Sequence, residues 1–124
     1  MSSKKDIRKK FRDGVFKRDK YTCQICGSKY SEKDSDPQLQ IINAHHITDR
    51  NELDNGGYCV ENGITVCDEK GKFPGKISCH MMVERFHISG GDESLVLPEY
   101  RPDTLYQKIG SSLELARKRS KALK

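Results

Sequence analysis

Tryptophan is missing from the 124 residues of this chain, and so is any long hydrophobic run. Hydrophobic residues make up 34% of the sequence and charged residues 33%, which leaves little apolar surface for a core. Small domains with a thin core often recruit disulfides or a bound metal. No segment approaches the ~20 apolar residues of a membrane helix, and the first five residues lack the apolar segment of a secretory signal. We therefore expect an intracellular, cytoplasmic protein without a membrane partner.

The five cysteines favour a metal site over a disulfide framework, because intracellular thiols stay reduced. Cys23 and Cys26 have the two-residue spacing with which two thiolates bind one Zn²⁺. A redox CxxC would need a strand–helix–strand pattern, and the sequence offers none. Cys67 and Cys79 can close a tetrahedral site if the residues between them are an insertion, which costs little loop entropy. Cys59 competes with Cys67 for that place or is a buried apolar thiol.

The net charge of +5 hides a segregation along the chain. Residues 4–20 carry a charge of +6 and residues 116–124 a charge of +5, so that the middle carries −6. Basic ends on an acidic middle indicate arms that hold a polyanion, although such ends are also common as solvated helix faces. If the polyanion is DNA, the expected phosphate contacts are Lys4, Lys5, Arg8, Lys9, Arg12, Arg117, Lys118, Arg119 and Lys121.

The length suits one domain of the small α+β class. Apolar residues at helical spacing predict a basic helix over 5–19. Alternating apolar residues over 39–47 and the β-branched run 63–66 predict two short antiparallel strands. Ser78 can cap a helix over 80–87. The expected parts are a basic N-terminal helix (1–20), a core (21–87) and a C-terminal region (88–124). The C-terminal region is expected to contain a linker at 88–94 and helices near 102–109 and 113–123. Polar loops are expected at 31–38, 48–61 and 68–77.

The histidines divide into two roles. Adjacent strand residues point to opposite faces, so His45 and His46 cannot easily bind one metal together and instead suit one ligand and one general base. His80 begins the following helix and can approach the same metal from the other side. Glu84 and His87 follow on the same helical face, and either can complete the shell.

The ordered set Cys-x-x-Cys, His-His-Ile, Asn-Gly-Ile-Thr-Val-Cys and Cys-His resembles the HNH endonuclease family in its zinc-braced, phage-type form. The resemblance covers about residues 11–87. It implies a ββα-metal (His-Me finger) core, in which His46 matches the general base and His45 the metal ligand before it. Asn62 matches the residue that braces the loop behind the base, and His80 matches a further metal ligand. Many relatives place another histidine four residues later, where this chain has Glu84 and its next histidine is His87.

The resemblance implies a metal-dependent DNA endonuclease that nicks or cuts DNA and leaves 5′-phosphate and 3′-hydroxyl ends. Its cofactors would be the structural Zn²⁺ and one catalytic divalent metal, for which imidazole-rich ligation allows Mg²⁺, Mn²⁺, Ni²⁺, Co²⁺ or Zn²⁺. DNA is the expected partner, with monomer and homodimer both open, and a phage-encoded protein acting in its host cell is one form of the cytoplasmic expectation. The alternatives are a non-catalytic zinc-binding DNA-binding module, which leaves the histidines unused, and a zinc finger that binds proteins.

Overall fold

The computed structural model describes residues 3–68 and 78–123 and has the expected small α+β class. The first helix, α1, spans Lys4–Arg18. It begins where the Ser3 hydroxyl accepts a hydrogen bond from the Asp6 amide, a common N-terminal cap. Phe11, Val15 and Phe16 form its buried face, so the narrow apolar stripe of the sequence is the side that packs against the sheet.

Two short strands, β1 (Ile42–His46) and β2 (Gly63–Cys67), pair antiparallel, with Ile42 opposite Cys67 and His46 opposite Gly63. The strand expected from residue 39 starts three residues later. Gln40 has a φ of 52°, which an extended strand does not accommodate. Leu39, outside the strand, is 52% exposed.

Helix α2 is the next helix along the chain after the sheet and spans Cys79–Ile88. The Ser78 hydroxyl caps it by accepting from the Met81 amide, as the sequence predicts. Val83 is its buried residue and belongs to the same core cluster as Ile64 and Val66 of β2. The expected loop at 68–77 falls almost entirely on residues 69–77, outside the described part.

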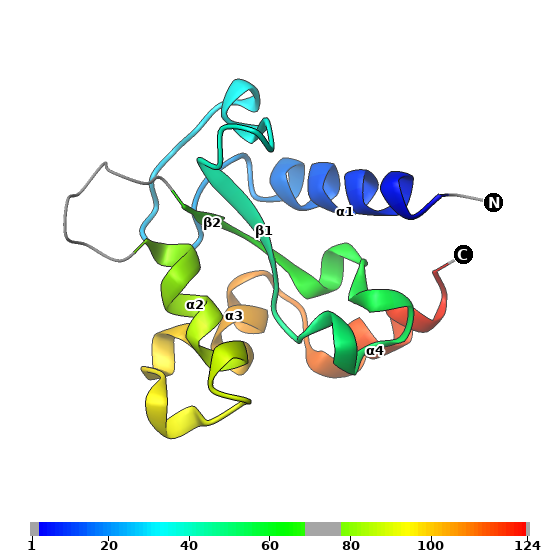
Figure 1. Cartoon of the computed structure of the whole chain (residues 1–124), viewed down its shortest axis with the longest axis vertical. Helices are drawn as coiled ribbons and strands as arrows, with labels where there is room; N and C mark the ends of the chain where they lie inside the picture. The colour runs from blue at the N-terminus through cyan, green and yellow to red at the C-terminus, as the bar shows by residue number, and fades with distance from the viewer. Residues whose placement is uncertain (1–2, 69–77, 124) are drawn as a thin grey trace.

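The last two helices of the described chain, α3 (Pro102–Lys108) and α4 (Leu113–Lys121), complete the core (Figure 1). Leu105 and Tyr106 of α3 and Ala116 of α4 belong to one buried cluster with residues of β2 and α2 and with Ile47, which directly follows β1. The basic C-terminal helix is therefore part of the fold on one face and exposed on the other. No helix of the described chain is long and apolar enough to cross a membrane.

The polar connections contain more local structure than the sequence suggests. The segment between the strands forms three short 3₁₀ turns, at Arg50–Glu52, Asp54–Gly57 and Val60–Asn62. Asn55 and Gly56 both have positive φ there, which turns the chain sharply. A further 3₁₀ turn, Glu32–Ser35, lies in the expected loop 31–38.

Candidate metal centres and functional site

Four cysteines from three segments come together beside the sheet. The ligand atoms of Cys23, Cys26, Cys67 and Cys79 all lie within 4.8 Å of one another, and the Sγ atoms of Cys26 and Cys67 are 3.7 Å apart. Cys23 and Cys26 lie in a turn that is closed by a hydrogen bond from the Gly27 amide to the Cys23 carbonyl. This cluster could hold a structural metal such as zinc, the ion that four thiolates in a closed set prefer.

The protonation of these thiols fits a cation at their centre. A hydrogen bond from the Cys79 thiol lowers the pKa of Cys23 to about 4. Burial, together with the negative charge of Cys23, raises the pKa of Cys67 to about 11. Without a cation, Cys67 thus stays a neutral thiol beside the Cys23 thiolate, because like charges at this separation repel. A divalent ion would remove that repulsion, so the donor set matches zinc chemistry.

Cys59 lies apart from this cluster. Its thiol is 5% exposed, and Sγ lies 3.4 Å from the Ser120 hydroxyl of α4. Burial raises the pKa of Cys59, which favours the neutral thiol. The structure therefore places it as a packing residue and brings Cys67 to the other three cysteines.

A second cluster is built from His45, His80 and Glu84, whose ligand atoms also lie within 4.8 Å of one another. His45 Nδ1 is 3.0 Å and His80 Nε2 is 3.4 Å from Oε1 of Glu84. His45 is 2% exposed on β1, whereas the other two side chains follow one turn apart on α2. Two ring nitrogens and a carboxylate converging on one point form a ligand set for a divalent metal with positions left open.

The electrostatics of this second cluster centre on the carboxylate. Hydrogen bonds from His45 and His80 lower the pKa of Glu84 well below its usual range. Burial lowers the pKa of His45 and outweighs the attraction of the nearby carboxylate. Burial also opposes the charged form of His80, but the hydrogen bond to Glu84 and the charge of Asp68 raise its pKa on balance. The carboxylate is thus ionised, as a metal ligand must be.

Asp68 is a member of the site that the sequence did not single out. Its Oδ2 lies 3.1 Å from His80 Nδ1, the ring nitrogen that faces away from Glu84, and its Oδ1 accepts from the Ser78 hydroxyl at 2.9 Å. A carboxylate on the outer nitrogen of a histidine fixes its tautomer and ring orientation for a metal on the inner one. Its position directly after Cys67 is the only sequence signal for it.

His87 is placed differently from the other candidates. Its Nε2 donates to the backbone carbonyl of His46 at 2.8 Å, and its ring stacks on that of His45 at 5.2 Å. On the regular helix α2 it lies one turn beyond Glu84. The structure therefore brings Glu84 into the cluster with His45 and His80. His87 instead contacts the His46 carbonyl and the His45 ring.

His46 points to the opposite side of β1 from His45, as strand alternation predicts. Its ring stacks on Phe11 of α1 at 4.6 Å and meets the edge of Tyr58 at 4.7 Å. Burial, with the positive charges around it, lowers the pKa of His46 to about 4, so the ring is neutral at pH 7. Its Nε2 is buried and has no hydrogen-bond partner among the described residues, which is uncommon because most buried polar atoms are hydrogen-bonded.

Asn62 ties together the two ends of the segment that follows His46. Its Oδ1 accepts from the Thr48 amide at 2.9 Å and from the Tyr106 hydroxyl at 2.8 Å. Its Nδ2 donates to the carbonyls of Thr48 and Gly57, both at 3.1 Å. The side chain is completely buried, so all these bonds are sheltered from water. Asn62 is a loop brace, in the place where the resemblance implies one.

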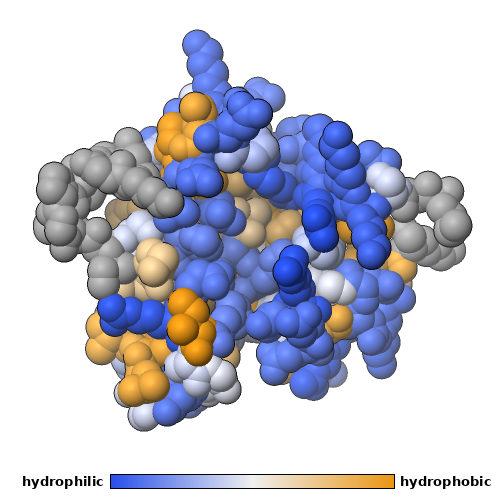
Figure 2. All heavy atoms as spheres, in the orientation of Figure 1, coloured by the Kyte–Doolittle hydropathy of each residue, from blue (hydrophilic) through white to orange (hydrophobic). Residues whose placement is uncertain are grey.

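The basic residues of the two terminal helices lie mostly on the surface. On α1, Lys4, Lys5, Arg8 and Lys9 are exposed, while Arg12 is half-buried with its guanidinium 5.0 Å from the Phe16 ring. Hydrophilic side chains dominate the face of the molecule around α1 (Figure 2). On α4 the exposed positions are Arg117, Lys118, Arg119 and Lys121.

Comparison with family models, with curated proteins and with solved structures finds no match for this chain. The interpretation of the site therefore depends on its own geometry and chemistry.

Proposed function

We propose that the protein is a metal-dependent DNA endonuclease of the HNH type, with a ββα-metal core formed by β1, β2 and α2. One observation carries the proposal: adjacent residues of β1 supply a member of the metal-ligand cluster, His45, and a buried histidine, His46, whose Nε2 has no hydrogen-bond partner among the described residues. A zinc-binding module without catalysis requires the four cysteines but neither of these two features. The pleat of the strand places the two histidines on opposite faces.

The donor set of the second cluster fits a catalytic divalent metal. His45, His80 and Glu84 would hold it, and Asp68 would keep the His80 ring in place. The bound ion would supply charge stabilisation to the phosphate and to the leaving 3′ oxygen. The carboxylate widens the choice toward Mg²⁺ and Mn²⁺, while the two imidazoles keep Ni²⁺, Co²⁺ and Zn²⁺ as candidates.

His46 would take the proton from the attacking water. A base must be unprotonated to accept a proton, and the low pKa of the buried ring keeps it so at neutral pH. Phe11 and Tyr58 fix the ring from two sides, and Asn62 holds the loop behind it. These neighbours limit the rotation of the ring and so pre-position its nitrogen.

DNA is the substrate that the surface charge favours. The exposed cations of α1 and α4 would bind backbone phosphates, which supplies affinity without reading the base sequence.

The test is a plasmid-cleavage assay with zinc-loaded protein across Mg²⁺, Mn²⁺, Ni²⁺, Co²⁺ and Zn²⁺. We expect nicked or linear product that depends on added metal and carries 5′-phosphate ends. His80→Ala should abolish it, and Lys108→Gln, an exposed change on α3, should leave it intact. DNA binding without cleavage in every metal would establish the non-catalytic zinc module instead.

A further inference from the structure

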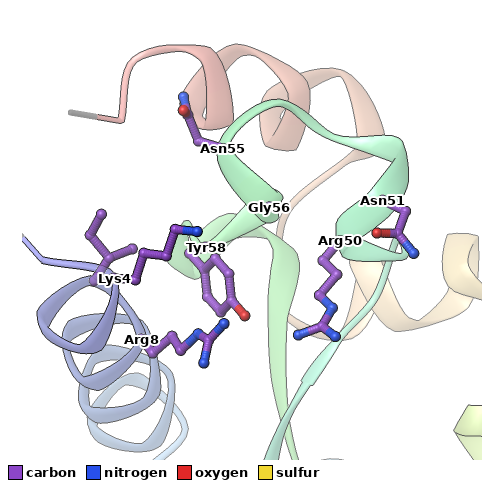
Figure 3. Close-up of a pocket in the computed structure, with 8 residues that line it drawn as sticks. Lys4, Arg8, Arg50, Asn51, Asn55, Gly56 and Tyr58 are labelled. Carbon is purple, nitrogen blue, oxygen red and sulfur yellow. The ribbon is translucent and has the colours of Figure 1, made fainter.

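A cationic cleft lies between the start of α1 and the turns that follow β1 (Figure 3), and one of its lining residues, Tyr58, contacts the His46 ring. Its volume is about 580 Å³. None of the described residues that line it is acidic, and three carry a positive charge: Lys4, Arg8 and Arg50. Arg50 was not among the DNA contacts expected from the sequence, because it lies in the otherwise polar segment between the two strands.

Tyr58 organises the cleft. The guanidinium of Arg8 lies 5.8 Å from its ring centroid. The Tyr58 hydroxyl interacts with Arg50 and raises the pKa of that guanidinium. The two arginines therefore approach one aromatic side chain from different elements, one from a helix and one from a 3₁₀ turn.

The far wall is held in shape by a left-handed turn. Asn55 and Gly56 have φ values of 56° and 72°, and a Cβ at residue 56 would lie 2.7 Å from a Tyr58 ring carbon. Only glycine satisfies both the conformation and the close approach at that position. The Asn55 side chain donates to the Ser120 carbonyl of α4 at 2.7 Å, which anchors the turn to the rest of the fold. The cleft is thus preformed.

The surroundings of Tyr58 favour a phosphate over a nucleobase as the ligand. Its ring already contacts Arg8, meets Phe11 edge-on at 5.5 Å and packs closely on Gly56. Little of the ring is left for the stacking that holds unpaired bases on aromatic side chains. The guanidinium groups, in contrast, are fork-shaped donors that match phosphate oxygens.

We infer that this cleft binds one backbone phosphate of DNA, through Arg8 and Arg50, close along the strand to the phosphate that is cut. The spacing supports this, because the Tyr58 ring lies 4.7 Å from the His46 ring and 5.8 Å from the Arg8 guanidinium, so that the base and the cleft are close neighbours. The bound phosphate falls one or two nucleotides from the scissile bond. The inference rests on the proposed function and adds the residues that align the DNA strand with the general base, His46.

The experiment measures DNA binding separately from cleavage. Full-length, zinc-loaded protein with His46→Ala, and no added divalent metal, is titrated against a labelled short duplex by fluorescence anisotropy over a range of salt. Arg50→Gln and Arg8→Gln are each compared with Lys108→Gln, which removes the same charge from an exposed site outside the cleft. Thermal melting verifies that each variant is folded, and two cleft variants are used so that one failure to fold does not end the test.

Arg50→Gln and Arg8→Gln should each reduce the slope of log K against log salt by ~0.9, whereas Lys108→Gln should not change it. A neutral methylphosphonate one or two positions from the cut should weaken binding, and this weakening should disappear in Arg50→Gln. If both cleft variants have the same salt slope as Lys108→Gln although the parent binds DNA, the cleft is not a phosphate site. The proposed function still stands in that case, provided that the protein with His46 intact cuts DNA. If the parent binds no DNA at low salt, both fail.

Discussion

The two candidate metal clusters of this protein are neighbours along the chain but offer different donors. The tetracysteine cluster offers four identical donors, which complete a tetrahedral set. The second cluster offers two imidazoles and a carboxylate, three donors in all, and therefore leaves coordination positions for water and substrate. A closed set suits an ion that holds the fold, whereas an open set suits an ion that takes part in chemistry.

The clusters share their backbone. Cys67 is followed directly by Asp68, which supports His80, and Cys79 is followed directly by His80 itself. The first residue of each pair belongs to the first cluster, and the next residue supports the second cluster (Asp68) or belongs to it (His80). A metal in the tetracysteine cluster would thus hold Asp68 and His80 in place for the second cluster. By thermodynamic linkage, a metal in the second cluster would strengthen binding in the first by the same factor.

The largest effect should come from breaking the closed cluster. Cys79→Ser removes a thiolate at the base of α2, and because zinc binding and folding are coupled, we expect loss of tight zinc and of a cooperative melting transition. Cys59→Ala is the control, since that thiol lies outside the cluster. Metal analysis and thermal melting decide the matter. A Cys79→Ser protein that retains one tight zinc and melts like the parent would refute this ligand set.

Changes in the open cluster should spare the fold. Glu84→Ala removes the carboxylate that both imidazoles contact. The affinity for the second metal should therefore fall by more than about 100-fold, the upper end for a residue that only supports a ligand. Binding of Mg²⁺ and Mn²⁺ should weaken most. His87→Ala should retain that affinity, because its Nε2 bonds to the His46 carbonyl. Calorimetric titration of zinc-loaded protein compares them. Equal reductions in both variants would place His87 in the metal shell after all.

A smaller effect is expected from Asp68→Asn. The amide keeps the size of the side chain but loses the charge that orients and polarises His80, so second-metal affinity should fall by about 10–100-fold while the tight zinc stays. Asp103→Asn, an exposed change at the start of α3, is the matched control. Metal titration of both proteins provides the measurement, and identical affinities would show that Asp68 only caps the strand end.

The smallest effect concerns the C-terminal cations. Ala116 and Ser120 are buried, so deleting residues 116–124 would damage the core and could not isolate the role of charge. Arg117→Gln and Lys118→Gln instead change exposed positions. Where a substitution removes a cation that binds a phosphate, the salt slope of DNA binding should fall by ~0.9 in an anisotropy titration. An unchanged slope in the double variant would show that this face of α4 is only solvated.

The sequence predicted the parts of the site that depend on local periodicity. The opposite directions of His45 and His46 follow from the pleat of a strand, and the pairing of His80 with Glu84 follows from one turn of a helix. The start of α2 followed from its capping serine. Each of these relations is set within a few residues and needs no knowledge of the tertiary fold.

What the sequence did not predict depends on distant contacts. Asp68 gains its role only because the fold brings it to His80, and Arg50 lines a cleft only because α1 packs beside its turn. The buried face of α4 is formed by small residues, Ala116 and Ser120, whose burial no hydrophobic pattern reveals. The sequence left Glu84 and His87 both open as the third ligand, and the regular geometry of α2 brings Glu84 to the cluster.

The division of labour between His45 and His46 is tested most directly by measuring second-metal affinity and cleavage on the same His46→Ala preparation, beside His45→Ala. The account predicts that His46→Ala binds the metal like the parent but cleaves DNA about 10²–10⁴-fold more slowly, because only the base is removed. His45→Ala should lose both. A His46→Ala protein that cleaves at the parental rate, or that loses the metal together with activity, would contradict the assignment of ligand and base to opposite faces of one strand.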